Sequence, residues 1–171
     1  MVGAAIAYNA LAGAEGPGAN LQGSQQSSAA QQANPLAPDF EVEAADGTLV
    51  QLSQLKGTPV VLNFWASTCG PCQSEMPGFQ AAFKQYGDQL QFMMVDIPGF
   101  NGETVERAKR FLQDNSYTFP AYFDTQGRAA AAFGLSSLPR TYFIDAQGAV
   151  VASAAGALDE QALQEGIDLL L

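Results

Sequence analysis

The chain has 171 residues, 47% of them hydrophobic, which is enough for one soluble domain with a buried core. Seven Lys and Arg against 17 Asp and Glu give a net charge of −10, so nucleic acid and anionic membrane surfaces are poor partners. The chain has no His, which excludes Ser-His and Cys-His catalysis and most transition-metal sites.

Residues 1–34 lack the pattern of a folded core. Residues 2–12 are apolar but shorter than the about 20 residues that span a bilayer, so we interpret them as the end of a signal peptide or membrane anchor. Residues 13–34 are mostly Gly, Ala, Ser and Gln, a composition that predicts a flexible tether. The alternative is a disordered apolar tail. We expect the folded domain to comprise residues 35–171.

Residues 40–52 contain apolar residues on both sides of Asp46-Gly47, which predicts two short strands around a turn. The run from Val60 to Trp65 is apolar on both faces, as expected for a central strand of a covered sheet. A helix is predicted to begin after Cys69 and to run to about Tyr86.

The rest of the chain alternates between strands and helices. The expected elements are a strand at 90–96, a helix at 104–114, a strand at 119–123, a helix at 128–133, a hairpin of strands at 140–145 and 149–154, and a helix from about 159. This order predicts an α/β fold, with a mixed central sheet flanked by helices on both faces.

Cys69 and Cys72 are the only cysteines, and they form a C-x-x-C motif where the central strand meets the helix. The unpaired N–H groups and the dipole at a helix N-terminus favour negative charge, which predicts a lowered pKa and a nucleophilic thiol for Cys69. Cys72 is near enough to close a disulfide, so the pair can exchange two electrons. A purely structural disulfide gains little from so short a loop, and zinc requires about four ligands.

Several motifs resemble a known family. The run Asn63 to Cys72, with Pro77 five residues after the second cysteine, resembles the thioredoxin fold, and residues 137–141 resemble the cis-proline loop of that fold. Residues 37–40, the hairpin before the first core strand, and the αβ insertion within 104–123 are similar to the TlpA/ResA-like extracytoplasmic thiol-disulfide oxidoreductases. The resemblance covers residues 35–171.

The resemblance implies roles for individual residues. Cys69 is the attacking thiolate, and Cys72 is the resolving thiol. Pro139 in the cis form faces the disulfide and leaves the backbone of Leu138 free to pair with an extended substrate segment. Glu75 lies one helical turn after Cys72, where it is expected to transfer protons.

Three more positions bear on the expected site. Asn63 stands where thioredoxin has an Asp, and an amide cannot exchange protons in the same way. Trp65, grouped with the substrate-binding residues, is expected to support the site more by packing than by chemistry. Arg140 departs from the Thr common after the cis-proline, and it is either a substrate contact or a surface side chain.

The expected function is reduction of disulfides in extracytoplasmic proteins by a monomer tethered to the membrane and supplied with electrons by an upstream membrane donor. We expect no cofactor beyond the redox-active disulfide, and no metal. One alternative is a thiol peroxidase of the peroxiredoxin type, but such enzymes have a Thr three residues before the reactive Cys, where this chain has Ala66. The other alternative is a binding module in which the C-x-x-C is only a clip.

Overall fold

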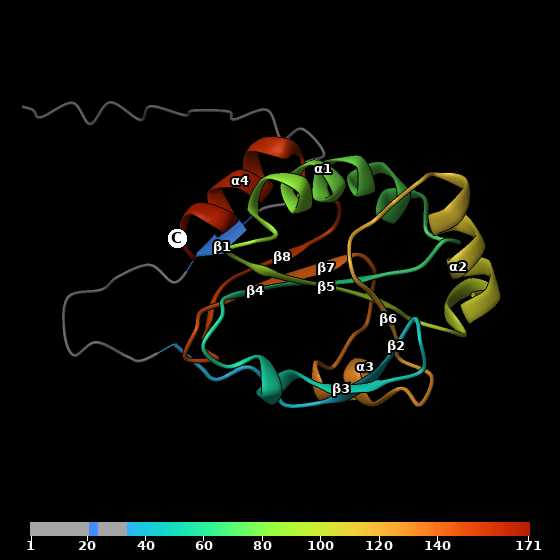
Figure 1. The fold of residues 1–171 in the computed structure, drawn as a ribbon, viewed down its shortest axis with the longest axis horizontal. Coiled ribbons are helices and arrows are strands. Elements are labelled where there is room, and N and C mark those ends of the chain that lie inside the picture. Colours follow the sequence, from blue (N-terminus) through green and yellow to red (C-terminus); the bar gives the residue numbers. More distant parts are fainter. Residues whose placement is uncertain (1–20, 24–33) are drawn as a thin grey trace, which may run out of the picture.

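An eight-stranded mixed sheet runs through the residues that the computed structural model describes, which are 21–23 and 34–171 (Figure 1). The strand order is β1-β8-β7-β4-β5-β6-β2-β3. The strands are β1 Leu21–Gly23, β2 Glu41–Ala44, β3 Leu49–Gln51, β4 Val60–Trp65, β5 Gln91–Asp96, β6 Ala121–Phe123, β7 Arg140–Ile144 and β8 Val150–Ala155. The helices are α1 Gly70–Tyr86, α2 Val105–Asp114, α3 Arg128–Ala132 and α4 Glu160–Asp168, with short 3-10 turns η1 Leu52–Leu55 and η2 Phe100–Gly102.

Helices cover both faces of the sheet, which confirms the predicted α/β architecture. α1, α2 and α4 lie on one face, and α3 and the β2–β3 hairpin lie on the other (Figure 1). β4 is buried along its whole length between its parallel neighbour β5 and its antiparallel neighbour β7. A strand in that position needs apolar side chains on both faces, which explains why every residue of β4 except Asn63 is apolar.

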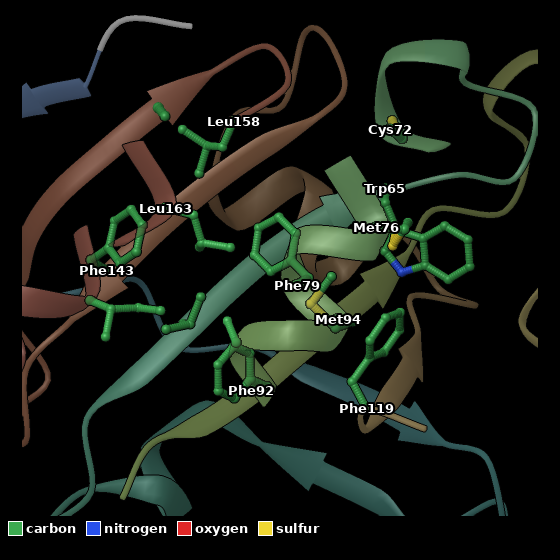
Figure 2. Packing of buried hydrophobic residues seen from close by; sticks show 14 of the residues in the cluster. Trp65, Cys72, Met76, Phe79, Phe92, Met94, Phe119, Phe143, Leu158 and Leu163 are labelled. Carbon is green, nitrogen blue, oxygen red and sulfur yellow. The ribbon is translucent and has the colours of Figure 1, made fainter. Parts of the chain in front are cut away.

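Alternate side chains of the central strands enter two separate cores, because successive residues of a strand point to opposite faces. Trp65, Phe92 and Met94 belong to the core beneath α1, and Figure 2 shows Phe79 of that helix among them. The second core contains alternate residues of the same strands, with aromatic partners from the hairpin and β7. Its members include Phe40, Leu62, Phe64, Met93 and Tyr142.

The helix ends agree with their sequence signals. Thr104 accepts a hydrogen bond from the Arg107 N–H at 3.2 Å at the start of α2, and Asp159 accepts one from the Ala162 N–H at 2.8 Å at the start of α4. Such side chains satisfy N–H groups that have no partner within the helix. Gly87 ends α1, and its N–H donates to the Phe83 carbonyl oxygen.

β1 was not predicted. Leu21–Gly23 pairs antiparallel with β8, with Leu21 opposite Ala154. The sequence prediction treated residues 13–34 as a tether without structure, and for these three residues that prediction was wrong. Pairing at a sheet edge uses backbone N–H and C=O groups and requires no apolar pattern, so composition gave no signal. The remainder of the predicted anchor and tether, residues 1–20 and 24–33, lies outside the described residues.

Among the helices described, none combines the length and the apolar character that crossing a membrane requires.

A chain that begins at Asn34 should keep its disulfide exchange activity and lose the three residue pairs of β1. We expect its melting temperature to fall by about 2–4 °C, the shift that about 1 kcal/mol produces in a protein of this size. Thermal unfolding and insulin reduction of the two chains would test this. A loss of activity would show that the N-terminal residues contribute to the site.

Candidate active site

Cys69 connects β4 to α1 and caps the helix. Its backbone is extended, with φ −104° and ψ 107°, and its Sγ accepts a hydrogen bond from the Cys72 N–H at 3.3 Å. Pro71 lies in the first turn of α1, where backbone N–H groups have no partner within the helix, so a residue without an N–H costs no helical hydrogen bond. Cys69 and Cys72 form a disulfide with their Cα atoms 5.2 Å apart.

The two sulfur-bearing residues differ in exposure. Cys69 is 6% exposed, whereas Cys72 is completely buried. A molecule that approaches the protein therefore meets Cys69 first. This arrangement suits an attacking thiol at Cys69 and a shielded resolving thiol at Cys72.

Glu75 lies one turn beyond Cys72 on α1 and is only 3% exposed. Its Oε1 accepts a hydrogen bond from Asn63 Nδ2 at 2.8 Å, and its Oε2 accepts one from the Leu158 N–H at 2.9 Å. Burial raises the pKa of Glu75 to about 7, although these two hydrogen bonds oppose the increase. A carboxyl group with this pKa can take up and release a proton near neutral pH.

Asn63 links its own strand, β4, to α1 and β7. Its Nδ2 donates to Glu75 on α1 and also to Thr141 Oγ1 on β7 at 3.1 Å. Asn63 and Thr141 are completely buried. Sequence reasoning missed this network, although polar residues at inward positions of buried strands were an available signal. The Leu158 N–H could not have been found, because a backbone donor has no signature in the sequence.

Trp65 is completely buried at the end of β4. Its ring packs against Phe111 of α2, with centroids 5.9 Å apart, and Figure 2 shows it in the core beneath α1. Its Nε1 has no hydrogen-bond partner among the described residues. The position suits the packing role expected of Trp65, and direct contact with a substrate stays a prediction.

The Leu138–Pro139 peptide bond is cis, as the resemblance implied. The Pro139 carbonyl oxygen accepts a hydrogen bond from the Gly156 N–H at 3.1 Å. Leu138 packs against the core cluster that contains both cysteines, and no backbone hydrogen bond among the described residues uses its N–H or C=O. Pairing of Leu138 with an extended peptide would require such groups, and the pairing stays a prediction.

Arg140 contacts an aromatic ring of its own strand, β7. Its guanidinium lies over the Tyr142 ring, 5.9 Å from the centroid, and Tyr142 belongs to the core on the sheet face opposite α1. A substrate contact by Arg140 stays a prediction.

Two further buried carboxyl groups, Asp96 and Glu103, lie at the carboxyl end of the parallel strands, and sequence reasoning did not single them out. Asp96 is completely buried and Glu103 is 3% exposed. Burial, together with the negative charge of Glu103, raises the pKa of Asp96 to about 8. The nearby Ile97 N–H lowers this pKa in part, although it donates its hydrogen bond to the Trp65 carbonyl oxygen at 3.0 Å.

Stability should fall as the pH rises. In the folded protein the pKa values of Glu75 and Asp96 lie above their ordinary values of 4.5 and 3.8, so between about pH 4 and pH 8 the folded state binds more protons than the unfolded state. The stability that these two protonated groups contribute is fully present below pH 4 and is lost as the pH rises to about 8. Each unit of pKa shift corresponds to about 1.4 kcal/mol. Urea unfolding should show that Asp96→Asn raises stability by up to about 6 kcal/mol at pH 9, the equivalent of a shift of about four pKa units, and not at pH 4. Asp88→Asn, at an exposed carboxyl, should change stability at neither pH.

The amino-acid sequence is similar to those of known proteins. The model of the AhpC/TSA family matches residues 34–153. The chain is 31% identical over 135 residues to the thiol-disulfide oxidoreductase ResA of Bacillus subtilis, covering 78% of this chain and 73% of ResA. It is 31% identical over 133 residues to the thioredoxin-like protein YneN of the same organism, covering 78% and 77%.

A solved structure is similar as well. The pneumococcal exposed lipoprotein thioredoxin Etrx1 of Streptococcus pneumoniae superimposes with a TM-score of 0.68 at 31% identity. The match covers 77% of this chain and 99% of the other. The likeness thus extends through most of this chain.

Proposed function

The chain belongs to the AhpC/TSA family and is a thiol-disulfide oxidoreductase of the ResA type, and from this premise we propose that it reduces disulfides in proteins outside the cytoplasm. One observation carries the proposal: Cys69 caps α1 in a disulfide with Cys72, and one helical turn after Cys72 the buried carboxyl group of Glu75 has a pKa raised to about 7. The pair supplies two electrons, and Glu75 can move the proton that the second half of the cycle requires.

The first step is attack by the Cys69 thiolate on one sulfur of a substrate disulfide. A bond forms between Cys69 and that sulfur, the substrate disulfide breaks, and the second substrate sulfur leaves as a thiolate that takes a proton from water. The free backbone groups of Leu138 would hold the substrate segment by strand-like hydrogen bonds.

The second step resolves the mixed disulfide. Cys72 gives its proton to the Glu75 carboxylate, and the resulting thiolate attacks Cys69 Sγ. The bond between Cys69 and the substrate breaks, and the substrate sulfur leaves as a thiolate that takes a proton from water. Two electrons have passed to the substrate, and the Cys69–Cys72 disulfide has formed. Glu75 then releases its proton to solvent, which a pKa of about 7 permits.

The protein must be reduced again before another cycle. We assign this step to an upstream dithiol donor in the membrane and propose that residues 1–34 tether a monomeric domain at the outer face. The apolar residues 2–12 and the polar composition that follows support this assignment. The description of Etrx1 as an exposed lipoprotein agrees with it.

Insulin reduction driven by dithiothreitol tests the function. We expect the protein to accelerate precipitation of the insulin B chain, and Cys69→Ala to abolish the acceleration. Hydrogen peroxide should not be consumed above background, because Ala66 occupies the position where peroxiredoxins carry Thr. Catalytic peroxide consumption by a protein that leaves insulin intact would contradict the proposal and favour the peroxidase alternative.

A further inference from the structure

Asn63 and Thr141 connect Glu75 to the central strands of the sheet. The two residues lie opposite each other in the antiparallel register of β4 and β7, and both are completely buried. Asn63 Nδ2 donates to Glu75 Oε1 at 2.8 Å and to Thr141 Oγ1 at 3.1 Å. An amide nitrogen carries two hydrogens, so both are used, and the donor end of the amide faces Glu75.

The acceptor end of the same amide is unsatisfied. Asn63 Oδ1 is buried and has no hydrogen-bond partner among the described residues. A buried acceptor without a partner destabilises the folded state, and every other residue of β4 is apolar. What the donor end does for Glu75 therefore explains the amide better than stability does.

We infer that Asn63 is a positioning residue for Glu75 and that Thr141 acts through it: the Thr141 hydroxyl fixes the amide, and the amide holds the Glu75 carboxylate ready for the Cys72 proton. The inference deepens the proposed function, since it rests on Glu75 as the proton acceptor. The Leu158 N–H holds the second carboxylate oxygen, and each oxygen keeps a lone pair for a proton.

The Asn63 hydrogen bond favours the charged form of Glu75, because a donor stabilises a carboxylate more than a protonated carboxyl group. Burial raises the pKa of Glu75, and this bond opposes the increase. Loss of the donor should therefore raise the pKa further. At pH 7 fewer molecules would carry the carboxylate, and transfer of the Cys72 proton would slow. At pH 9 the carboxylate would have formed with or without the donor.

The pKa of Glu75 depends on burial and its two hydrogen bonds, with no contribution from another charged side chain among the described residues. The guanidinium of Arg140 on β7 lies over the Tyr142 ring on the opposite face of the sheet. The carboxyl group of Asp96 on β5 makes no hydrogen bond within the described part of the chain. The other charged residues of α1, of α4 and of the α4 cap are exposed: Lys84, Asp159, Glu160, Glu165 and Asp168.

Infrared titration of the oxidised protein tests the inference on Glu75 itself. The carbonyl band of a protonated carboxyl group disappears as the group ionises, and Glu75→Gln identifies the band. The disulfide removes the Cys72 thiol from the titration. We expect Asn63→Leu to raise the midpoint by about one pH unit, a tenfold change in the ionisation equilibrium. Thr141→Val should raise it by less, and Thr141→Ser, which keeps the hydroxyl, should retain the parent's midpoint.

Single-turnover resolution of the mixed disulfide between pH 5 and pH 9 gives a second readout. Asn63→Leu should resolve about five- to tenfold more slowly than the parent at pH 6 to pH 7 and should equal it at pH 9. A merely structural role for Asn63 would slow resolution by the same factor at every pH.

Gln80→Leu is the matched control. Gln80 is also a buried amide on α1, but its Nε2 donates to Thr118 Oγ1 at 2.9 Å and its Oε1 accepts from the Thr118 N–H at 2.6 Å. Its infrared titration and its pH profile should coincide with those of the parent.

An unchanged Glu75 midpoint in Asn63→Leu would overturn the inference, as would equal slowing at every pH or an equal shift in Gln80→Leu. If Asn63→Leu fails to fold, Thr141→Val compared with Thr141→Ser decides. The infrared titration needs no substrate, so the result can be read even if insulin reduction fails.

Discussion

Replacing Cys72 with Ser should convert the protein into a covalent trap for its substrates. Cys69 remains able to attack a disulfide, but the buried thiol that breaks the mixed disulfide is gone. We expect insulin turnover to disappear and a stable adduct to accumulate at Cys69. Non-reducing electrophoresis and mass spectrometry of a mixture with a disulfide-bonded protein would detect the adduct.

Cys69→Ser is the control for the trap. It should give neither turnover nor adduct, because Cys72 is completely buried and cannot reach a substrate. Adduct formation through Cys72 in that variant would reverse the roles of the two cysteines. Adducts recovered from the native source would also identify the physiological substrates.

Glu75→Gln should slow resolution of the mixed disulfide by roughly a hundredfold at pH 7, within the range typical of a lost general base. In the parent, the resolution rate should rise with pH through about 7 as the carboxylate forms, and in the variant this rise should be absent. Single-turnover reduction of a small disulfide between pH 5 and pH 9 measures both effects.

The Gln variant is expected to fold. Its amide oxygen can still accept from the Leu158 N–H, and its NH₂ group can donate to Asn63 Oδ1, a buried oxygen that has no partner among the described residues. Glu106→Gln, at an exposed carboxylate on α2, is the matched control and should leave the pH profile unchanged. Identical profiles for the parent and Glu75→Gln would show that the proton travels through water instead.

The sequence predicted the central elements well because their signals are strong. A run that is apolar except for Asn63 gives the bounds of β4, and a cysteine cap with Gly87 gives those of α1. Where the sequence signal was weaker, the predicted bounds of an element differ from the observed ones. The strand expected at 119–123 begins at Ala121, because Pro120 has no N–H to donate to a neighbouring strand.

The site was predictable to the extent that its residues are close in sequence. Glu75 follows Cys72 by one helical turn, and the resemblance gave it a role. Glu103 stands in a glycine-containing loop, and only the folded chain places its carboxyl group against the Thr68 N–H. Asp96 ends an apolar strand, which is an unusual place for a carboxylate and the one hint that the sequence offered.

The three-residue strand β1 affects the tendency of the protein to associate with other chains. β8 runs for six residues, Val150–Ala155, and without Leu21–Gly23 its outer hydrogen-bonding groups would be open to a strand from another molecule. Exposed edges of that kind are templates for intermolecular pairing and aggregation. With β1 in place, the outermost strands on both sides are only three residues long, which makes them poor templates. By covering the edge of β8, residues 21–23 thus help to prevent association of the chains at high local concentration.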